Sequence, residues 1–243
     1  MRLKYLRVHT FYAVMRPFSA RARQRRMQLF ARLMRAAAGT SILDLGGEPE
    51  FWNSFGARLE IIVLNLPGIA KTEVSSHHAM RCIVGDACNV VGFADRQFDI
   101  AFSNSVIEHV GPAAKQEAFA HEVRRLGKSY WVQTPSRWFP IEAHCGMPFW
   151  WFYPAVVRKF FLERWRRKLP SWTEMVEGTT VLARRDLKRL FPEATIVIER
   201  FCGIPKSYIA YFHGGAQAGH SASARSLQKI VSPSVTEVSR FDS

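Results

Sequence analysis

The chain has 243 residues, of which 48% are hydrophobic, so it is long enough for one α/β domain with a full core and needs no second domain. The net charge is +14 and is unevenly spread: residues 1–40 hold ten Lys or Arg residues and no acid, whereas residues 41–213 hold 21 basic and 18 acidic residues. This distribution indicates a basic N-terminal arm and argues against a domain whose whole surface binds nucleic acid. The longest apolar run, residues 147–157, is too short to span a bilayer, and the absence of a C-x-x-C pair argues against a zinc site or a disulfide framework.

An amphipathic helix is predicted over residues 17–38. Apolar side chains recur there with helical spacing, at Met27, Phe30 and Met34, and most of the arginines lie on other faces of the helix. Two interpretations stay open. The helix packs on the edge of the following domain, or it is an arm that binds anionic lipid, polysaccharide or RNA.

A predicted strand at residues 41–45 runs directly into the pair Gly46-Gly47. Adjacent glycines allow positive φ and a close approach of the backbone to a ligand. Asp44 is the one charged residue of the strand, and an ionised carboxylate is costly there unless a partner stabilises it. This combination indicates a ligand-binding corner at the edge of a sheet.

Strands and helices alternate from residue 41 onward, which predicts βαβ units and a parallel sheet. The last two predicted strands are close enough in sequence to form an antiparallel hairpin. The predicted strands are residues 41–45, 60–65, 80–84, 98–103, 128–134, 194–201 and 206–212, and the predicted helices lie near residues 51–58, 113–126, 153–168 and 184–191.

Polar residues follow three further strands of this predicted sheet. Asn65 ends the second strand, 21 residues after Asp44, and this spacing places a polar side chain at the ribose hydroxyls in nucleoside-binding α/β folds. Asp86 follows the third strand, and Asn104 and Ser105 follow the fourth. Because ligands bind at the carboxyl edge of such sheets, we expect these side chains to line one site.

The run at residues 44–47 resembles the D-x-G-x-G motif of class I S-adenosylmethionine-dependent methyltransferases. It departs from that motif because Glu48 and Glu50 stand where later glycines are usual. The matching segments cover about residues 40–212, and the variant looks like a type 11-like subgroup with no assigned substrate. The resemblance implies a Rossmann-like sheet of seven strands, mostly parallel with an antiparallel C-terminal hairpin, and helices on both faces.

The same resemblance implies S-adenosyl-L-methionine as the cofactor. The family uses an acid after the third strand for the adenine amino group, and most members have an acid where Asn65 stands, so the amide should hold the ribose less firmly. The implied cofactor-binding residues lie at the carboxyl ends of the strands and are Asp44, Gly46, Gly47, Asn65, Asp86, Ala87, Asn104 and Ser105.

Two Glu–His combinations are the candidate catalytic residues. Glu108 and His109 follow the fourth strand, where related enzymes place such a pair near the sulfonium. Glu142 and His144 lie in a segment, Pro-Ile-Glu-x-His, that looks like the family's substrate-side loop. Either histidine could accept a proton from a hydroxyl acceptor, since the unperturbed pKa of His is about 6.5. Both groups also have a structural interpretation, in which they only hold their loops.

The predicted domain organisation has three parts: a basic N-terminal helical extension at 1–40, a methyltransferase domain at 41–213 and a flexible tail at 214–243. Within the domain, an aromatic and basic insert at 146–180 is expected on the substrate side. The apolar stripe of its helix is interpreted either as core or as an interfacial surface that meets anionic lipid through residues 148–168.

The leading functional hypothesis is methyl transfer from S-adenosylmethionine to a small molecule or to a glycan-type or lipid-linked acceptor. The alternatives are an RNA methyltransferase, which an N-P-P-Y motif or a catalytic cysteine motif would have favoured, and a methyltransferase-like protein that binds without turnover. A nucleic-acid partner is therefore not expected. We expect a cytoplasmic protein, with peripheral membrane contact through the basic arm and the insert.

Overall fold

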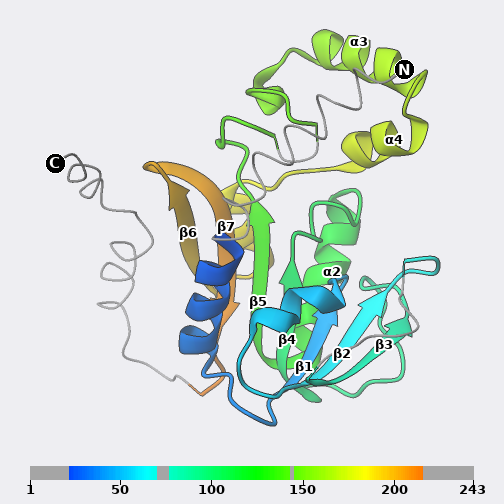
Figure 1. Ribbon diagram of the computed structural model, residues 1–243. Coiled ribbons are helices and arrows are strands. Elements are labelled where there is room, and N and C mark those ends of the chain that lie inside the picture. The colour runs from blue at the N-terminus through cyan, green and yellow to red at the C-terminus, as the bar shows by residue number, and fades with distance from the viewer. Residues whose placement is uncertain (1–21, 70–76, 143–144, 216–243) are drawn as a thin grey trace, which may run out of the picture.

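The computed structural model describes residues 22–69, 77–142 and 145–215. They form one seven-stranded sheet in the order β3-β2-β1-β4-β5-β7-β6 (Figure 1). The strands are β1 (Ser41–Leu45), β2 (Glu60–Asn65), β3 (Ala79–Val84), β4 (Phe98–Asn104), β5 (Gly127–Pro135), β6 (Thr195–Phe201) and β7 (Ile204–Phe212). All seven predicted strands are present, with small differences at their ends.

The first five strands are parallel, and β7 pairs antiparallel with both β5 and β6. The strand order reverses direction along the sequence between β1 and β4, so the carboxyl ends of β1 and β4 meet at the switch point where such sheets bind ligands. The predicted fold class, a mostly parallel Rossmann-like sheet with an antiparallel C-terminal end, is confirmed.

Helices cover both faces of the sheet. On one face α2 (Ala113–Leu126) and α5 (Arg184–Leu190) contribute Phe119, Val123 and Leu187 to a core with the side chains of β1 and β5. The other face is covered by a helix at residues 22–34 and by the short 3-10 helix η1 (Pro49–Ser54).

The N-terminal helix at residues 22–34 is part of this second core. Phe30 is fully buried, and its ring makes edge-on contacts with Trp52, Phe102 and Trp131 at centroid distances of 5.8, 5.2 and 5.5 Å. Met27 is also buried, at 4% exposure. For these residues the packing interpretation of the amphipathic pattern holds, and the segment before residue 22 lies outside the described residues.

The helix predicted near residues 51–58 is replaced by η1. Pro49 begins this 3-10 helix, since its ring fixes φ and the first turn of a helix needs no amide donor from it. Glu48 is the residue that precedes the helix and Glu50 lies in its first turn, where a negative charge is favourable. The residues that depart from the glycine-rich motif therefore form the beginning of helix η1.

The insert forms two helices instead of the one predicted. α3 (Ala155–Arg166) follows the short 3-10 helix η2 (Trp150–Phe152), and α4 (Pro170–Gly178) was not predicted. Figure 1 shows α3 and α4 beyond the carboxyl end of β5, outside the two layers that cover the sheet. In the part of the chain that the structure describes, every helix is too short or too polar to cross a membrane. The predicted tail beyond residue 215 lies outside the described residues.

Replacing Phe30 with Ala should lower the free energy of unfolding by about 3–5 kcal/mol, because a fully buried aromatic side chain leaves a cavity. Replacing Arg32 with Ala on the exposed face of the same helix should change it by less than about 0.5 kcal/mol. Denaturant unfolding of both variants measures the difference. Equal effects would show that this helix is not part of the core.

Candidate functional site

The site begins at the carboxyl end of β1, where Asp44 is completely buried. Its Oδ2 accepts a hydrogen bond of 2.8 Å from the indole Nε1 of Trp52, and its Oδ1 has no hydrogen-bond partner among the described residues. Burial raises the pKa of the Asp44 carboxyl to about 7, and the bond from Trp52 offsets only part of that effect. Asp44 thus has one buried oxygen whose hydrogen-bonding capacity the described residues leave unused.

The glycine turn closes directly over this carboxyl group. Gly46 has φ +81°, and a Cβ atom there would lie 2.7 Å from Cγ1 of Val106. A Cβ on Gly47 would lie 1.9 Å from Oδ2 of Asp44. No side chain fits at either position, so the backbone itself forms the wall beside Asp44.

Asn65 stabilises the other side of the same turn. Its Nδ2 donates a hydrogen bond of 2.9 Å to the carbonyl oxygen of Gly47, which fixes the glycine turn to the end of β2. The bond uses one of the two protons of the amide nitrogen and leaves the side-chain oxygen as an acceptor.

Asp86 lies after β3, on a loop that is held to helix α2. Its Oδ1 accepts a hydrogen bond of 2.8 Å from the amide of Cys88, which is the main reason its pKa lies below the usual value, and Lys115 of α2 contacts Oδ2 at 3.3 Å. Ala87 is buried beside it in the core.

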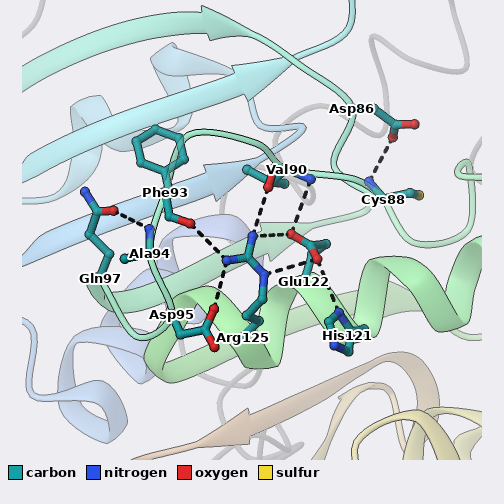
Figure 2. A network of polar contacts seen from close by, with 10 residues as sticks. All are labelled: Asp86, Cys88, Val90, Phe93, Ala94, Asp95, Gln97, His121, Glu122 and Arg125. Carbon is teal, nitrogen blue, oxygen red and sulfur yellow. Dashed lines mark hydrogen bonds and ion pairs between the residues drawn. The ribbon is translucent and has the colours of Figure 1, made fainter.

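Arg125 of α2 anchors the rest of this loop (Figure 2). It donates hydrogen bonds to the carbonyl oxygens of Val90 and Phe93, at 2.9 and 3.0 Å, and pairs with Glu122 at 2.6 Å. Burial alone would raise the pKa of Glu122, but the bonds from Arg125 outweigh it and the pKa lies below its usual value. The loop that presents Asp86 is therefore tied to a rigid helix.

Asn104 and Ser105, at the end of β4, belong to a polar network that the sequence did not reveal. Arg26 donates from Nη1 to Oδ1 of Asn104 at 2.6 Å and to Oε1 of Gln133 at 3.2 Å. Ser105, which has φ +58°, donates to the same oxygen of Gln133 at 2.8 Å. The side chains of both predicted cofactor-binding residues are thus oriented by neighbours on β5 and on the N-terminal helix.

The same guanidinium group forms a buried ion pair with Glu199 of β6. Arg26 and Glu199 are each 7% exposed; Nη2 contacts Oε2 at 2.7 Å, and Nε lies 3.1 Å from Oε2 and 3.2 Å from Oε1. Ser207 of β7 also donates to Glu199. Burial would raise the pKa of Glu199, yet the charge and hydrogen bonds of Arg26 hold it below its usual value. Arg26 was not predicted because its partners lie far away in the sequence.

The first Glu–His pair is anchored on both sides. Glu108 is fully buried, and its Oε2 accepts a hydrogen bond of 3.0 Å from Thr134 at the end of β5. His109 is exposed, and its Nδ1 lies 3.2 Å from Oγ1 of Thr179. The Thr179 hydroxyl donates its proton to the carbonyl oxygen of Met175, so it accepts from His109. The contact orients the imidazole ring of His109 against α4.

Glu142 of the second pair closes its own loop. It is 5% exposed, and its Oε2 accepts a hydrogen bond of 2.7 Å from the amide of Cys145. His144 lies outside the described residues. Within residues 22–69, 77–142 and 145–215, no three His, Cys, Asp or Glu side chains are grouped to hold a metal ion.

Replacing Arg26 with Met should cost about 3–5 kcal/mol of unfolding free energy, because Glu199 would stay buried without its cation. The double variant Arg26→Met/Glu199→Met should recover part of this loss, since it leaves no isolated charge. The depressed pKa of Glu199 adds stability that is present at neutral pH and lost as pH falls through the carboxylate range, so the double variant should lose less stability in acid. Unfolding curves at neutral and acidic pH measure both effects.

The matched control is Arg25→Met, which removes an exposed charge from the same turn of the helix and should change stability by less than about 0.5 kcal/mol. An Arg26→Met variant that is as stable as this control would contradict the role of the ion pair.

Comparison with known proteins supports the expected family. Residues 61–129, which run from β2 through α2 into β5, match the family described as methyltransferase domain. No curated protein matches the sequence.

Several solved structures are similar to the chain at low sequence identity. A chain in the complex between the Haloferax volcanii Trm112 methyltransferase activator and a methyltransferase has a TM-score of 0.51 and 11% identity, and the alignment covers 87% of this chain and 97% of that one. Magnesium protoporphyrin IX methyltransferase from Synechocystis PCC 6803 has a TM-score of 0.47 and 11% identity, with 86% of this chain and 94% of that chain covered.

Phosphoethanolamine N-methyltransferase 2 from Haemonchus contortus, solved with S-adenosyl-L-methionine, has a TM-score of 0.46 and 12% identity. The alignment covers 71% of this chain, which spans only 37% of the length of that protein. The sheet order, its antiparallel end and the match of residues 61–129 to a methyltransferase domain agree with the family that the glycine-turn motif resembles.

Proposed function

We propose that this protein transfers a methyl group from S-adenosylmethionine to a small-molecule acceptor or to a glycan-type or lipid-linked acceptor. The observation that carries the proposal is the turn at Gly46 and Gly47, which closes over a buried Asp44 whose Oδ1 has no hydrogen-bond partner among the described residues. A wall of bare backbone beside an available carboxylate oxygen suits a cationic ligand with hydrogen-bonding groups.

The residues at the other strand ends fit the remaining parts of such a cofactor. We propose that the side-chain oxygen of Asn65 accepts a hydrogen bond from a ribose hydroxyl, since its amide nitrogen already donates to the carbonyl oxygen of Gly47. Asp86 would accept a hydrogen bond from the adenine amino group, since its contacts with Cys88 and Lys115 keep the carboxyl group ionised. Asn104 and Ser105 would complete the pocket at the end of β4, in positions set by Arg26 and Gln133.

The bound cofactor would supply a methyl group on a positively charged sulfonium. The protein must then hold the acceptor near attack geometry, and positioning alone contributes a large part of such catalysis. A hydroxyl acceptor also needs a base. We assign this role to His109, because it follows β4, its ring is oriented by Thr179, and imidazole accepts a proton near neutral pH. Glu108 would orient this turn through Thr134, and Glu142 would shape the loop that carries the second candidate base, His144.

The insert supports an acceptor with an apolar part. Val156 and Phe160 of α3 are 80% and 60% exposed, on a helix that also carries Arg164 and Lys159. Such a surface favours peripheral contact with anionic membrane from the cytoplasmic side.

The RNA methyltransferase alternative loses support, because Arg26 of the basic extension is buried in an ion pair and does not face a partner. A methyltransferase-like protein that binds the cofactor without turnover remains the second candidate, because the glycine turn runs into Glu48 and η1.

Calorimetry with S-adenosylmethionine tests the cofactor site, and its pH dependence tests Asp44. The free carboxyl has a pKa of about 7 and a cationic ligand favours its ionised form, so affinity should rise as pH increases through about 7. Binding below that pH should release a proton, which titrations in buffers of different ionisation enthalpy detect. The Asp44→Asn variant should bind S-adenosylmethionine more weakly, and its affinity should not change with pH in this range. No binding by the folded protein would overturn the proposed function.

Replacing His109 with Gln should lower methyl incorporation into a hydroxyl acceptor about 100-fold, the usual scale for loss of a general base. Cofactor affinity should stay within about twofold of the starting value, because the assigned role concerns the acceptor proton. Labelled cofactor and a fractionated cell extract provide the assay. His121→Gln, at an exposed histidine of α2, is the control. Equal activity in both variants would exclude His109 as the base while leaving the cofactor site intact.

A further inference from the structure

A second pocket lies in the insert, between η2, α3 and α4 and outside the strand-end residues described above. It has a volume of about 270 Å³, which is room for a small organic molecule since one water occupies roughly 30 Å³. One face of α3 lines it, with Arg158 and Leu162 one turn apart, and Trp150, Trp151 and Val176 close the other sides.

The charges around this pocket do not balance. Arg166 pairs with Glu177, and Lys159 lies 3.9 Å from Glu163, so the two acids of the lining already have cationic partners. Arg158 has none among the described residues, and its Nε is buried without a hydrogen-bond partner. A buried guanidinium nitrogen without an acceptor is costly, which suggests that a ligand provides the acceptor.

Three features favour a phosphate as that acceptor. The guanidinium fork matches the oxygen spacing of a phosphate, and such bonds are shorter and stronger than neutral ones. The contact between Lys159 and Glu163 is long and their side chains are 78% and 55% exposed, so Lys159 can turn toward a second negative charge. Ala155, the first residue of α3, also lines the pocket and brings the positive end of the helix dipole to it.

The remaining walls are suited to an apolar group. Trp150 is 2% exposed and stacks on Trp165 at 5.3 Å, so the indole wall of the pocket is held rigidly. Val156 and Phe160 lie one turn apart on α3, beside the face that lines the pocket, and both are exposed. An amphiphile could place its charged group inside and its apolar part along this stripe.

We propose that this pocket binds a phosphate group joined to an apolar body, with Arg158 as its main partner. The phosphate belongs either to a lipid headgroup or to a soluble phosphomonoester, and the chemistry of recognition is the same. The site is independent of the methyl-transfer proposal, because binding to it can be measured without cofactor.

Hexyl phosphate is the soluble probe, and its binding to the full chain is measured by calorimetry and by the fluorescence of the pocket tryptophans. Arg158→Gln should weaken binding about tenfold or more, the scale of a lost hydrogen bond to a charged group. Arg164→Gln removes the same charge from an exposed position that does not line the pocket, and should change affinity by less than about twofold. Ala155→Trp should abolish binding by filling the pocket without a change of charge.

Vesicles of phosphatidylcholine, with and without phosphatidic acid, identify the source of the phosphate. Sedimentation that requires phosphatidic acid and falls in Arg158→Gln but not in Arg164→Gln would identify a lipid headgroup. Hexyl phosphate binding without such a vesicle effect would identify a soluble phosphomonoester. The proposal is overturned if hexyl phosphate does not bind the unaltered protein. It is also overturned if the Arg158→Gln and Ala155→Trp variants bind hexyl phosphate as tightly as the unaltered protein does.

Discussion

The buried ion pair between Arg26 and Glu199 is the interaction on which the arrangement of this protein depends. Taking two charges out of water costs several kcal/mol, so the pair is stable only if its other hydrogen bonds are satisfied. Asn104, Gln133 and Ser207 satisfy them. These acceptors and donors come from β4, β5 and β7, so one guanidinium group fixes the N-terminal helix, the antiparallel hairpin and the carboxyl edge of the sheet relative to one another. A segment that looks like a basic extension is in this way built into the site.

A second constraint acts at the glycine turn. Trp52 donates to Asp44 and contacts Phe30, so the indole joins the carboxyl edge of the sheet to the core that the N-terminal helix forms. The unusual Glu48-Pro49-Glu50 sequence is needed to begin the short helix that carries Trp52. The loss of later glycines is therefore compatible with a working turn, because close approach is required only at Gly46 and Gly47.

Much of the fold could be predicted because its signals are local. Apolar residues predominate in most strands, and the polar residues at strand ends, such as Asn65 and Asp86, stand at spacings set by the βαβ unit. The predictions failed where tertiary contacts determine the local structure or the partner of a side chain. Residues 51–58 have a helical pattern, but Pro49 and the burial of Trp52 select a shorter 3-10 helix. No periodicity could identify the carboxylate partner of Arg26 or the carbonyl partners of Arg125 at Val90 and Phe93, which distant segments supply.

The separation of 173 residues between Arg26 and Glu199 has a consequence for how the chain reaches this state during synthesis. The N-terminal helix is made before the sheet, and its Phe30 can pack as soon as β4 and β5 are present, but Arg26 cannot reach Glu199 until β6 has been made. Until then Arg26 lacks its carboxylate partner. Contacts of such high sequence separation also slow folding, so completion of the domain should be a late, post-translational step and a point of dependence on chaperones.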